Sequence, residues 1–400
     1  MKKQIIPQPK YRSFFGTTFA LCSLMAMTFS LLFGISLISI DAAPVSGSAP
    51  IRVERVILFI IDGLADEAPE RLPMSQLQKL AERGCTYKSM HLPLPGHPRD
   101  DPNYSWSCSM PNPMLMAGTP FIGTEGIRKS MIQHQFKPEE TAFIVNAYSY
   151  KDVSGGFGVY FSKPHREDAM VITETKRLLT ESKPVFMRVH LQRSGIEGEK
   201  CSKDKYVDMP WHRNIWHPSS PYRKACLRAD RHLGDFVAWL EEKDLWKGTV
   251  LLVCGDHGQA NEGWHEPYSA SSSRTTLVIV GEGVVPGRRV ESCEIFDIAP
   301  TIAHLAGRVT PPMAIGRVLK EAFDPELSSP PMSENVSRLN QLLRTTKTRS
   351  PSQLTALRKR GFLTIDDIGQ WHTTKAGTDF PSFIRLQKQL ASESRLSEEP

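Results

Sequence analysis

Asp256 and His257 stand directly after an uninterrupted apolar run, residues 250–254, and glycine flanks the pair on both sides. Such a run predicts a strand that is buried on both faces, as in a parallel sheet covered by helices. Ligands of these sheets bind outside the carboxyl ends of the strands, which is where the pair would lie. A carboxylate and an imidazole on a compact turn suit a divalent metal ion. The alternative is that Asp256 caps the next helix beside an unrelated surface histidine.

A second carboxylate, Asp62, also follows an apolar run. Residues 56–61 read Val-Ile-Leu-Phe-Ile-Ile, and Asp62-Gly63 follows them. The run predicts a second buried strand that delivers Asp62 at its carboxyl end. We therefore expect Asp62, Asp256 and His257 to converge on one ion-sized space. Strand ends are rigid positions, so this site should be mostly independent of residues 192–220, an expected insertion.

Ser109 is the candidate nucleophile. It precedes Met110-Pro111-Asn112 and an apolar stretch that ends at Gly118. Pro111 suits the first turn of a helix and Gly118 its end, which places Ser109 at the helix N-terminus, where backbone N–H groups favour anions. A hydroxyl there could attack phosphorus or sulfur. The alternative is a serine that only caps its helix.

Further candidate ligands lie in two later segments. Asp208 and His212 are four residues apart within residues 192–220, which we expect to be an irregular insertion, and both could reach one ion from a turn. His217 lies in the same insertion and is a rival ligand, and a solvated loop with incidental polar residues is the alternative. His265 lies beyond the central strand, where a single histidine is usually a surface residue.

The segments around these residues alternate between two patterns. Continuous apolar runs predict strands, and apolar residues at helical spacing predict helices between them. The alternation predicts an α/β fold with a mostly parallel central sheet and helices on both faces. The expected strands are 56–61, 142–145, 185–191, 250–254 and 276–280, and the expected helices begin near residues 74, 111, 169, 226 and 297.

The N-terminus is not expected to belong to this fold. Basic residues precede an uncharged, largely apolar stretch, residues 14–40, and small residues follow it, as in an export signal. Its 27 residues also exceed the length of about 20 that spans a bilayer. Residues 1–43 are therefore predicted to be a signal peptide or a membrane anchor. The remainder would be exported, to the periplasm or the outside of the cell, secreted or held by this anchor.

The rest of the chain divides into a linker at 44–52, a globular domain at 53–323 and a polar, basic, partly helical tail at 324–400. A composition of 40% hydrophobic and 23% charged residues is typical of a globular protein. The formal net charge of +6 is too small to predict binding to duplex nucleic acid. No Cys-x-x-Cys pair occurs among the 7 cysteines, so a structural zinc site is not expected.

Over residues 53 to about 320, these motifs resemble the alkaline phosphatase superfamily of metallohydrolases. Asp62 resembles the family's first carboxylate, Asp256-His257-Gly258 matches its Asp-His-Gly motif, and Ser109-Met-Pro-Asn resembles the Thr-x-Pro-Asn segment of nucleotide pyrophosphatase/phosphodiesterases. The resemblance implies that Asp62, Ser109, Asp256 and His257 surround one divalent ion. It implies a second ion, with zinc as the expected metal at both positions, held by Asp208, His212 and His265.

The resemblance implies a metal-dependent phosphoester hydrolase, either a phosphodiesterase or a phosphomonoesterase, with a covalent phosphoseryl intermediate. The substrate would be a small-molecule, glycan-linked or lipid-linked ester. A sulfatase-like hydrolase of sulfuric esters is the nearest alternative, although Pro113 stands where the formylglycine motif Cys/Ser-x-Pro-x-Arg has arginine. A non-catalytic binding protein that retains the fold is another. One departure concerns the second ion, because the family's Asp-x-x-x-His usually follows a strand directly, whereas Asp208 lies deep in an insertion.

Overall fold

The computed structural model describes most of the globular domain and little of the ends of the chain. The described residues are 53–92, 111–118, 129–148, 150–263, 271–272, 274–312, 314 and 316–328, together with the backbone of two short paired strands, β9 (Leu363–Ile365) and β10 (Trp371–Thr373). Ser109, His265 and the apolar segment 14–40 lie outside the described residues. No helix in the described part of the chain is long and apolar enough to cross a membrane.

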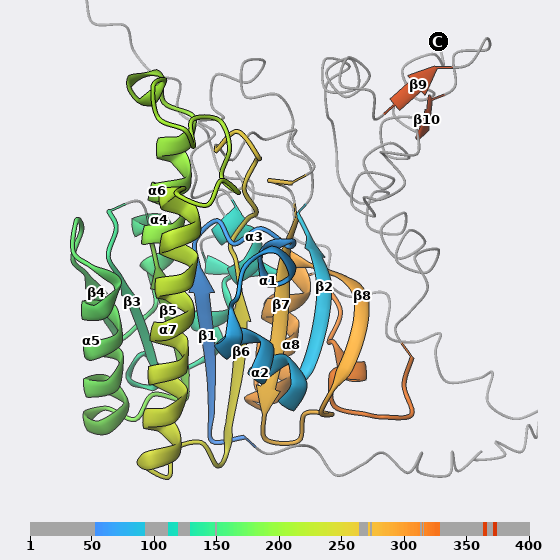
Figure 1. Ribbon diagram of the computed structural model, residues 1–400. Coiled ribbons are helices and arrows are strands. Elements are labelled where there is room, and N and C mark those ends of the chain that lie inside the picture. Colours follow the sequence, from blue (N-terminus) through green and yellow to red (C-terminus); the bar gives the residue numbers. More distant parts are fainter. Residues whose placement is uncertain are drawn as a thin grey trace, which may run out of the picture. The chain divides into compact units, whose positions relative to one another are not determined.

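The centre of the domain is an eight-stranded sheet (Figure 1). Only β7 runs against the other strands, because it pairs antiparallel with both of its neighbours while the remaining pairs are parallel. The prediction of a mostly parallel sheet is confirmed. In order across the sheet, the strands are β4 (Val159–Ser162), β3 (Thr141–Val145), β5 (Phe186–Leu191), β1 (Arg55–Ile61), β6 (Thr249–Cys254), β7 (Arg274–Gly281), β2 (Cys85–His91) and β8 (Arg288–Glu294).

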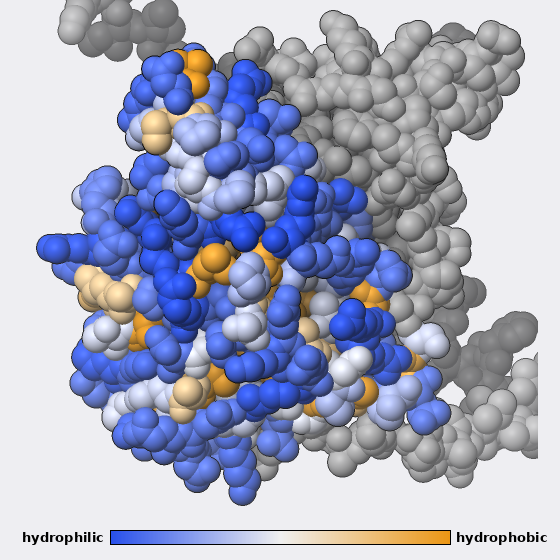
Figure 2. Space-filling model, viewed as in Figure 1, coloured by the Kyte–Doolittle hydropathy of each residue, from blue (hydrophilic) through white to orange (hydrophobic). Residues whose placement is uncertain are grey.

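Helices cover both faces of this sheet, as predicted. One face packs against α1 (Ala68–Arg71), α2 (Ser75–Arg83), α5 (Asp168–Glu181) and α7 (Pro221–Glu242). The other face packs against α3 (Pro111–Ala117) and α8 (Ile298–Leu305). Figure 2 shows that the outer surface over α5 and α7 is mainly hydrophilic, which fits helices that bury only one face.

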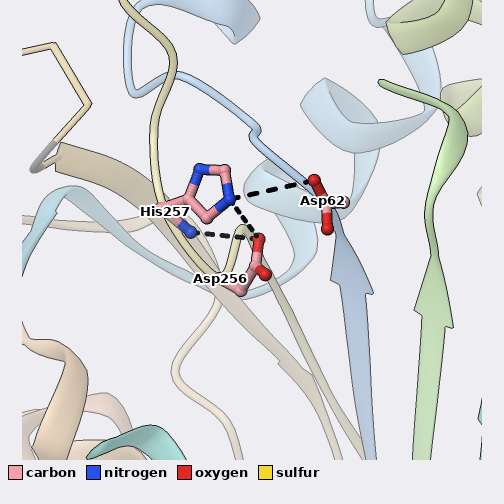
Figure 3. Close-up of side chains that lie close together, drawn as sticks. All are labelled: Asp62, Asp256 and His257. Atoms are coloured by element: carbon pink, nitrogen blue, oxygen red, sulfur yellow. Dashed lines mark hydrogen bonds and ion pairs between the residues drawn. The ribbon is translucent and has the colours of Figure 1, made fainter. Parts of the chain in front are cut away.

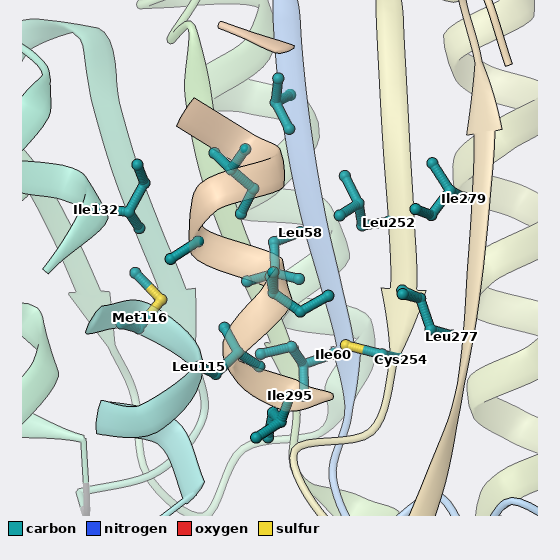
Figure 4. Packing of buried hydrophobic residues seen from close by; sticks show 14 of the residues in the cluster. Leu58, Ile60, Leu115, Met116, Ile132, Leu252, Cys254, Leu277, Ile279 and Ile295 are labelled. Carbon is teal, nitrogen blue, oxygen red and sulfur yellow. The ribbon is translucent and has the colours of Figure 1, made fainter. Parts of the chain in front are cut away.

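The apolar runs of β1 and β6 are continuous because helices cover both faces of the sheet, so that every side chain of these runs is buried in one of two cores. In β1, Val56, Leu58 and Ile60 belong to the core shared with α3 and α8, whereas Ile57, Phe59 and Ile61 belong to the core shared with α2, α5 and α7. Figure 4 shows Leu58 and Ile60 beside Leu252 and Cys254 of β6 in the first of these cores. Full burial of one such side chain contributes about 1.5–3 kcal/mol. Both strands are therefore held rigidly, and so are the residues that follow them.

The expectation of an irregular segment over 192–220 is wrong for its first part, which forms α6 (Arg193–Cys201) and packs along α7. Its sequence, Arg-Ser-Gly-Ile-Glu-Gly-Glu-Lys-Cys, has few apolar residues and two glycines, so it shows no helical pattern. Its glycines allow α6 to pack closely against its neighbours. A Cβ atom at Gly198, for example, would lie 2.5 Å from the side chain of Gln259. A short helix, α4 (Lys151–Ser154), and several single 3-10 turns complete the described connections.

Candidate metal centre

Three neighbouring strands deliver the polar residues of the site. β1 lies between β5 and β6, and all three are parallel. Ile60 is paired with Cys254 of β6, so Asp62 and Asp256, each two residues further on, leave the sheet side by side. Ile61 is paired with Leu191 of β5, which brings the start of α6 to the same edge. Register in the sheet therefore places two carboxylates at one point.

Asp62, Asp256 and His257 form a compact buried group (Figure 3). The Nε2 atom of His257 lies 3.8 Å from Oδ1 of Asp62 and 3.7 Å from Oδ1 of Asp256. The three ligand atoms lie within 4.8 Å of one another, and the residues are 2%, 0% and 3% exposed, respectively. The structure thus brings together the three residues that the strand-end argument places at one ion-sized space.

The imidazole of His257 is oriented by its own turn. Its Nδ1 atom lies 2.7 Å from the carbonyl oxygen of Gly258, so the proton on Nδ1 is donated to that oxygen and Nε2 faces the carboxylates. Burial lowers the pKa of His257, but the charges of Asp256 and Asp62 and the bond to Gly258 outweigh burial and raise it. The two carboxylates therefore favour a cation at Nε2, which is a proton or a metal ion.

Polar neighbours hold the outer oxygen of each carboxylate. Oδ2 of Asp62 accepts hydrogen bonds from the hydroxyl of Tyr150, at 2.8 Å, and from the side-chain amide of Gln192. Oδ2 of Asp256 accepts a 2.9 Å bond from Nδ2 of Asn112, at the start of α3. Burial raises the pKa of Asp62, and the charge of His257 and the bonds from Tyr150 and Gln192 oppose that rise.

His190, in β5, lies on the outer side of both carboxylates. Its Nε2 atom is 3.3 Å from Oδ2 of Asp62 and 3.7 Å from Oδ2 of Asp256, and its side chain is fully buried. Burial lowers the pKa of His190 to about 3, so the ring is neutral at physiological pH. His190, Tyr150 and Gln192 were not predicted as site residues. For His190, the available signal was that polar residues interrupt the otherwise apolar run of β5 near its carboxyl end.

The residues expected to hold a second ion are not part of this group. Asp208 is exposed and His212 partly buried, and the only cluster of three metal-ligand side chains among the described residues is that of Asp62, Asp256 and His257. At the place directly after β5, where the resemblance puts Asp-x-x-x-His, residues 192–198 contain neither aspartate nor histidine. Ser109 and His265 lie outside the described residues, although the contact of Asn112 with Asp256 brings the start of α3 to the site.

The donor set fits a divalent ion. Two carboxylate oxygens and an imidazole nitrogen are ligands that zinc and similar ions accept, at about 2.0–2.2 Å. Oxygen and nitrogen atoms 3.7–3.8 Å apart are compatible with a common ion at such distances. Three protein ligands leave a position open for substrate, which is typical of catalytic rather than structural sites. Two adjacent buried carboxylates also need a positive charge between them.

Comparison with known proteins agrees with this geometry. The sulfatase family model matches residues 120–308, a stretch that contains Asp256 and His257. Over this stretch the chain is similar to sulfatases, which fits a sulfatase-related member of the alkaline phosphatase superfamily. Among its curated relatives, arylsulfatase K of Gallus gallus is 30% identical over 90 residues and choline-sulfatase of Rhizobium meliloti (strain 1021) is 32% identical over 82 residues.

These alignments are short. They cover 21% and 20% of this chain, and only 17% and 16% of the two relatives. Among solved structures, a protein of Bacteroides thetaiotaomicron, from a locus for the metabolism of multiple glycosaminoglycans, has a TM-score of 0.51 at 15% identity. That alignment covers 70% of this chain and 78% of the other, and it supports the fold.

Proposed function

We propose that the protein is a metal-dependent hydrolase of sulfuric or phosphoric esters. The observation that carries this proposal is the buried group of Asp62, Asp256 and His257 at the carboxyl edge of the sheet, in a chain related to sulfatases. The matched relatives are named for sulfatase activity, which makes a sulfate ester the first candidate substrate. The ester would be carried by a small molecule or a glycan.

A divalent ion held by Asp62, Asp256 and His257 is part of this proposal, with zinc as the expected metal. When bound, such an ion polarises the ester oxygens and stabilises the charge that develops on them. The second ion expected from the sequence would need Asp208, His212 and His265 to assemble. Measurement of zinc per chain separates a one-ion from a two-ion centre.

Ser109 is the proposed nucleophile. Asn112, three residues after it, contacts Asp256, which supports a place for Ser109 beside the metal centre. The Ser109 oxygen would bond to sulfur or phosphorus as the bond to the alcohol oxygen breaks, and the serine proton would end on that oxygen, so that the alcohol is released. Water would then hydrolyse the seryl ester and release sulfate or phosphate.

A phosphate ester is the second candidate, and one feature of the sequence favours it. Pro113 stands where the formylglycine motif of sulfatases has arginine, so Ser109 is proposed to act as an unmodified serine. Mass spectrometry of the Ser109 peptide detects conversion to formylglycine, which would overturn this part of the proposal.

Export directed by residues 14–40 stays a prediction.

The test compares wild type, Ser109→Ala and Ser109→Thr with 4-nitrophenyl sulfate, 4-nitrophenyl phosphate and bis(4-nitrophenyl) phosphate. We expect Ser109→Ala to lose several orders of magnitude in turnover and to fold normally, and Ser109→Thr to keep part of the activity. If Ser109 only caps its helix, Ser109→Ala keeps its activity and loses about 0.5–2 kcal/mol of stability. Zinc-loaded wild type that hydrolyses none of the three esters would favour a non-catalytic binding protein.

A further inference from the structure

Arg188, in β5, is a fully buried cation beside the candidate metal centre. Its side chain is 0% exposed, and its guanidinium carbon lies 4.5 Å from the ring centroid of Phe143 and 5.6 Å from that of Tyr150. Within the described part of the chain, no carboxylate lies within ion-pair distance of it. Burial lowers the pKa of Arg188 to about 10, so the group keeps its charge at neutral pH. Burial of an arginine without a carboxylate partner is costly, which calls for a compensating role.

Arg188 contacts two residues, Asn112 and His190, that in turn contact the site carboxylates. Its Nη2 atom donates a hydrogen bond to Oδ1 of Asn112, and it lies 3.3 Å from Nδ1 of His190. Arginine can only donate, so Asn112 must present its amide nitrogen on the other side, toward Oδ2 of Asp256. For the same reason Nδ1 of His190 accepts from Arg188, which turns Nε2 toward the outer oxygens of Asp62 and Asp256.

We propose that Arg188 is a positioning residue for the metal centre. By fixing the orientation of Asn112 and His190, it holds the outer oxygens of the two carboxylates and keeps their inner oxygens, Oδ1, facing His257. This inference rests on the proposed function, because it requires Asp62, Asp256 and His257 to bind a metal ion. Partners that orient metal ligands in this way typically change metal affinity about 10- to 100-fold when they are replaced.

Zinc affinity, measured by competition with a chromogenic chelator, tests the role of Arg188. We expect Arg188→Met to bind zinc about 10- to 100-fold more weakly than wild type. Arg188→Lys should fall between the two, because it keeps the charge and loses the planar fork of donors. Arg177→Met is the matched control and should bind zinc like wild type, since Arg177 lies exposed on α5 and its ion pairs among the described residues are with Glu174 and Glu181.

The outcomes separate this inference from the proposed function. Folded Arg188→Met with unchanged zinc affinity, even with a lower melting temperature, would show that Arg188 only packs the core. If Arg188→Met does not fold, Asn112→Ala removes one of its two links and should itself weaken zinc binding about 10-fold. Unchanged zinc affinity in Asn112→Ala would then overturn the inference. Wild type that binds no zinc would contradict the proposed function instead.

Discussion

In each of the two site carboxylates, Asp62 and Asp256, the two oxygens have different neighbours. The inner oxygens of Asp62 and Asp256 face His257, and the outer ones accept hydrogen bonds from uncharged donors. Burial, followed by the charges of Asp62 and Asp256, raises the pKa of Tyr150 well above its usual value, so its hydroxyl keeps the proton that it donates. Hydrogen bonds to ionised groups are among the stronger ones, which makes these donors effective in fixing the carboxylates.

We predict that Tyr150→Phe weakens zinc binding about 10-fold, because Asp62 loses the 2.8 Å hydrogen bond that orients it. Tyr160→Phe is the matched control. The hydroxyl of Tyr160 is buried and has no hydrogen-bond partner among the described residues, so its removal should leave zinc affinity unchanged and stability equal or higher. Equal zinc affinities for Tyr150→Phe and wild type would show that the bond is incidental.

The junction between β5 and α6 constrains the site, contrary to the expectation that the site is mostly independent of residues 192–220. Gln192 leaves β5 and contacts Asp62 through its side chain, and the hydroxyl of Ser194 donates to the backbone oxygen of Asp62 at 2.5 Å. The backbone of α6 approaches so closely that a Cβ atom at Gly195 would lie 1.6 Å from Oδ1 of Asp62. Glycine is required at this position by the close approach of the helix to a candidate metal ligand.

We therefore predict that Gly195→Ala lowers both zinc affinity and melting temperature, since α6 or Asp62 must move. Alanine otherwise favours a helix over glycine by about 1 kcal/mol, so a loss would come from the contact and not from the backbone. Gly155→Ala is the control, because nothing lies within 4 Å of the added Cβ atom and Gly155 has a φ of −60°. If Gly195→Ala matched Gly155→Ala in stability and bound zinc normally, the proposed constraint would be wrong.

At the scale of the whole molecule, the site depends on a core that is continuous with it. Leu252 of β6 is fully buried, and it packs beside Leu58 of β1 and Ile279 of β7 (Figure 4). Asp256 and His257 follow the same strand. The metal ligands therefore stand at the ends of the strands that the core holds in place.

We predict that Leu252→Ala lowers the free energy of unfolding by about 2–5 kcal/mol. Leu327→Ala, at a leucine that is 39% exposed, should cost much less. In urea titrations, zinc release and loss of circular dichroism should coincide in wild type and in both variants, because the site and the core unfold together. Zinc release well before the loss of secondary structure would contradict this dependence.

The sequence by itself determined the central strands and the residues at their ends. Five or six consecutive apolar residues can be buried on both faces only in the middle of a covered sheet, so 56–61 and 250–254 were recognisable, and Asp62, Asp256 and His257 with them. Strand β2 (Cys-Thr-Tyr-Lys-Ser-Met-His) was not predicted, because its polar residues hide the pattern. The pattern of apolar residues along the chain indicates which segments are buried, and the most buried strands lie in the middle of the sheet.

Only the tertiary structure decided which segments meet. The order of the strands cannot be read from periodicity, so the pairing of β1 with both β5 and β6, which brings residues of β5 beside the two carboxylates, required the fold. The same holds for Arg188, His190 and Tyr150, whose polar side chains acquire a role only from neighbours distant in the chain. Asp208 and His212 have ligand spacing in the sequence and yet do not belong to the cluster of Asp62, Asp256 and His257, because spacing along a chain fixes no position relative to a sheet.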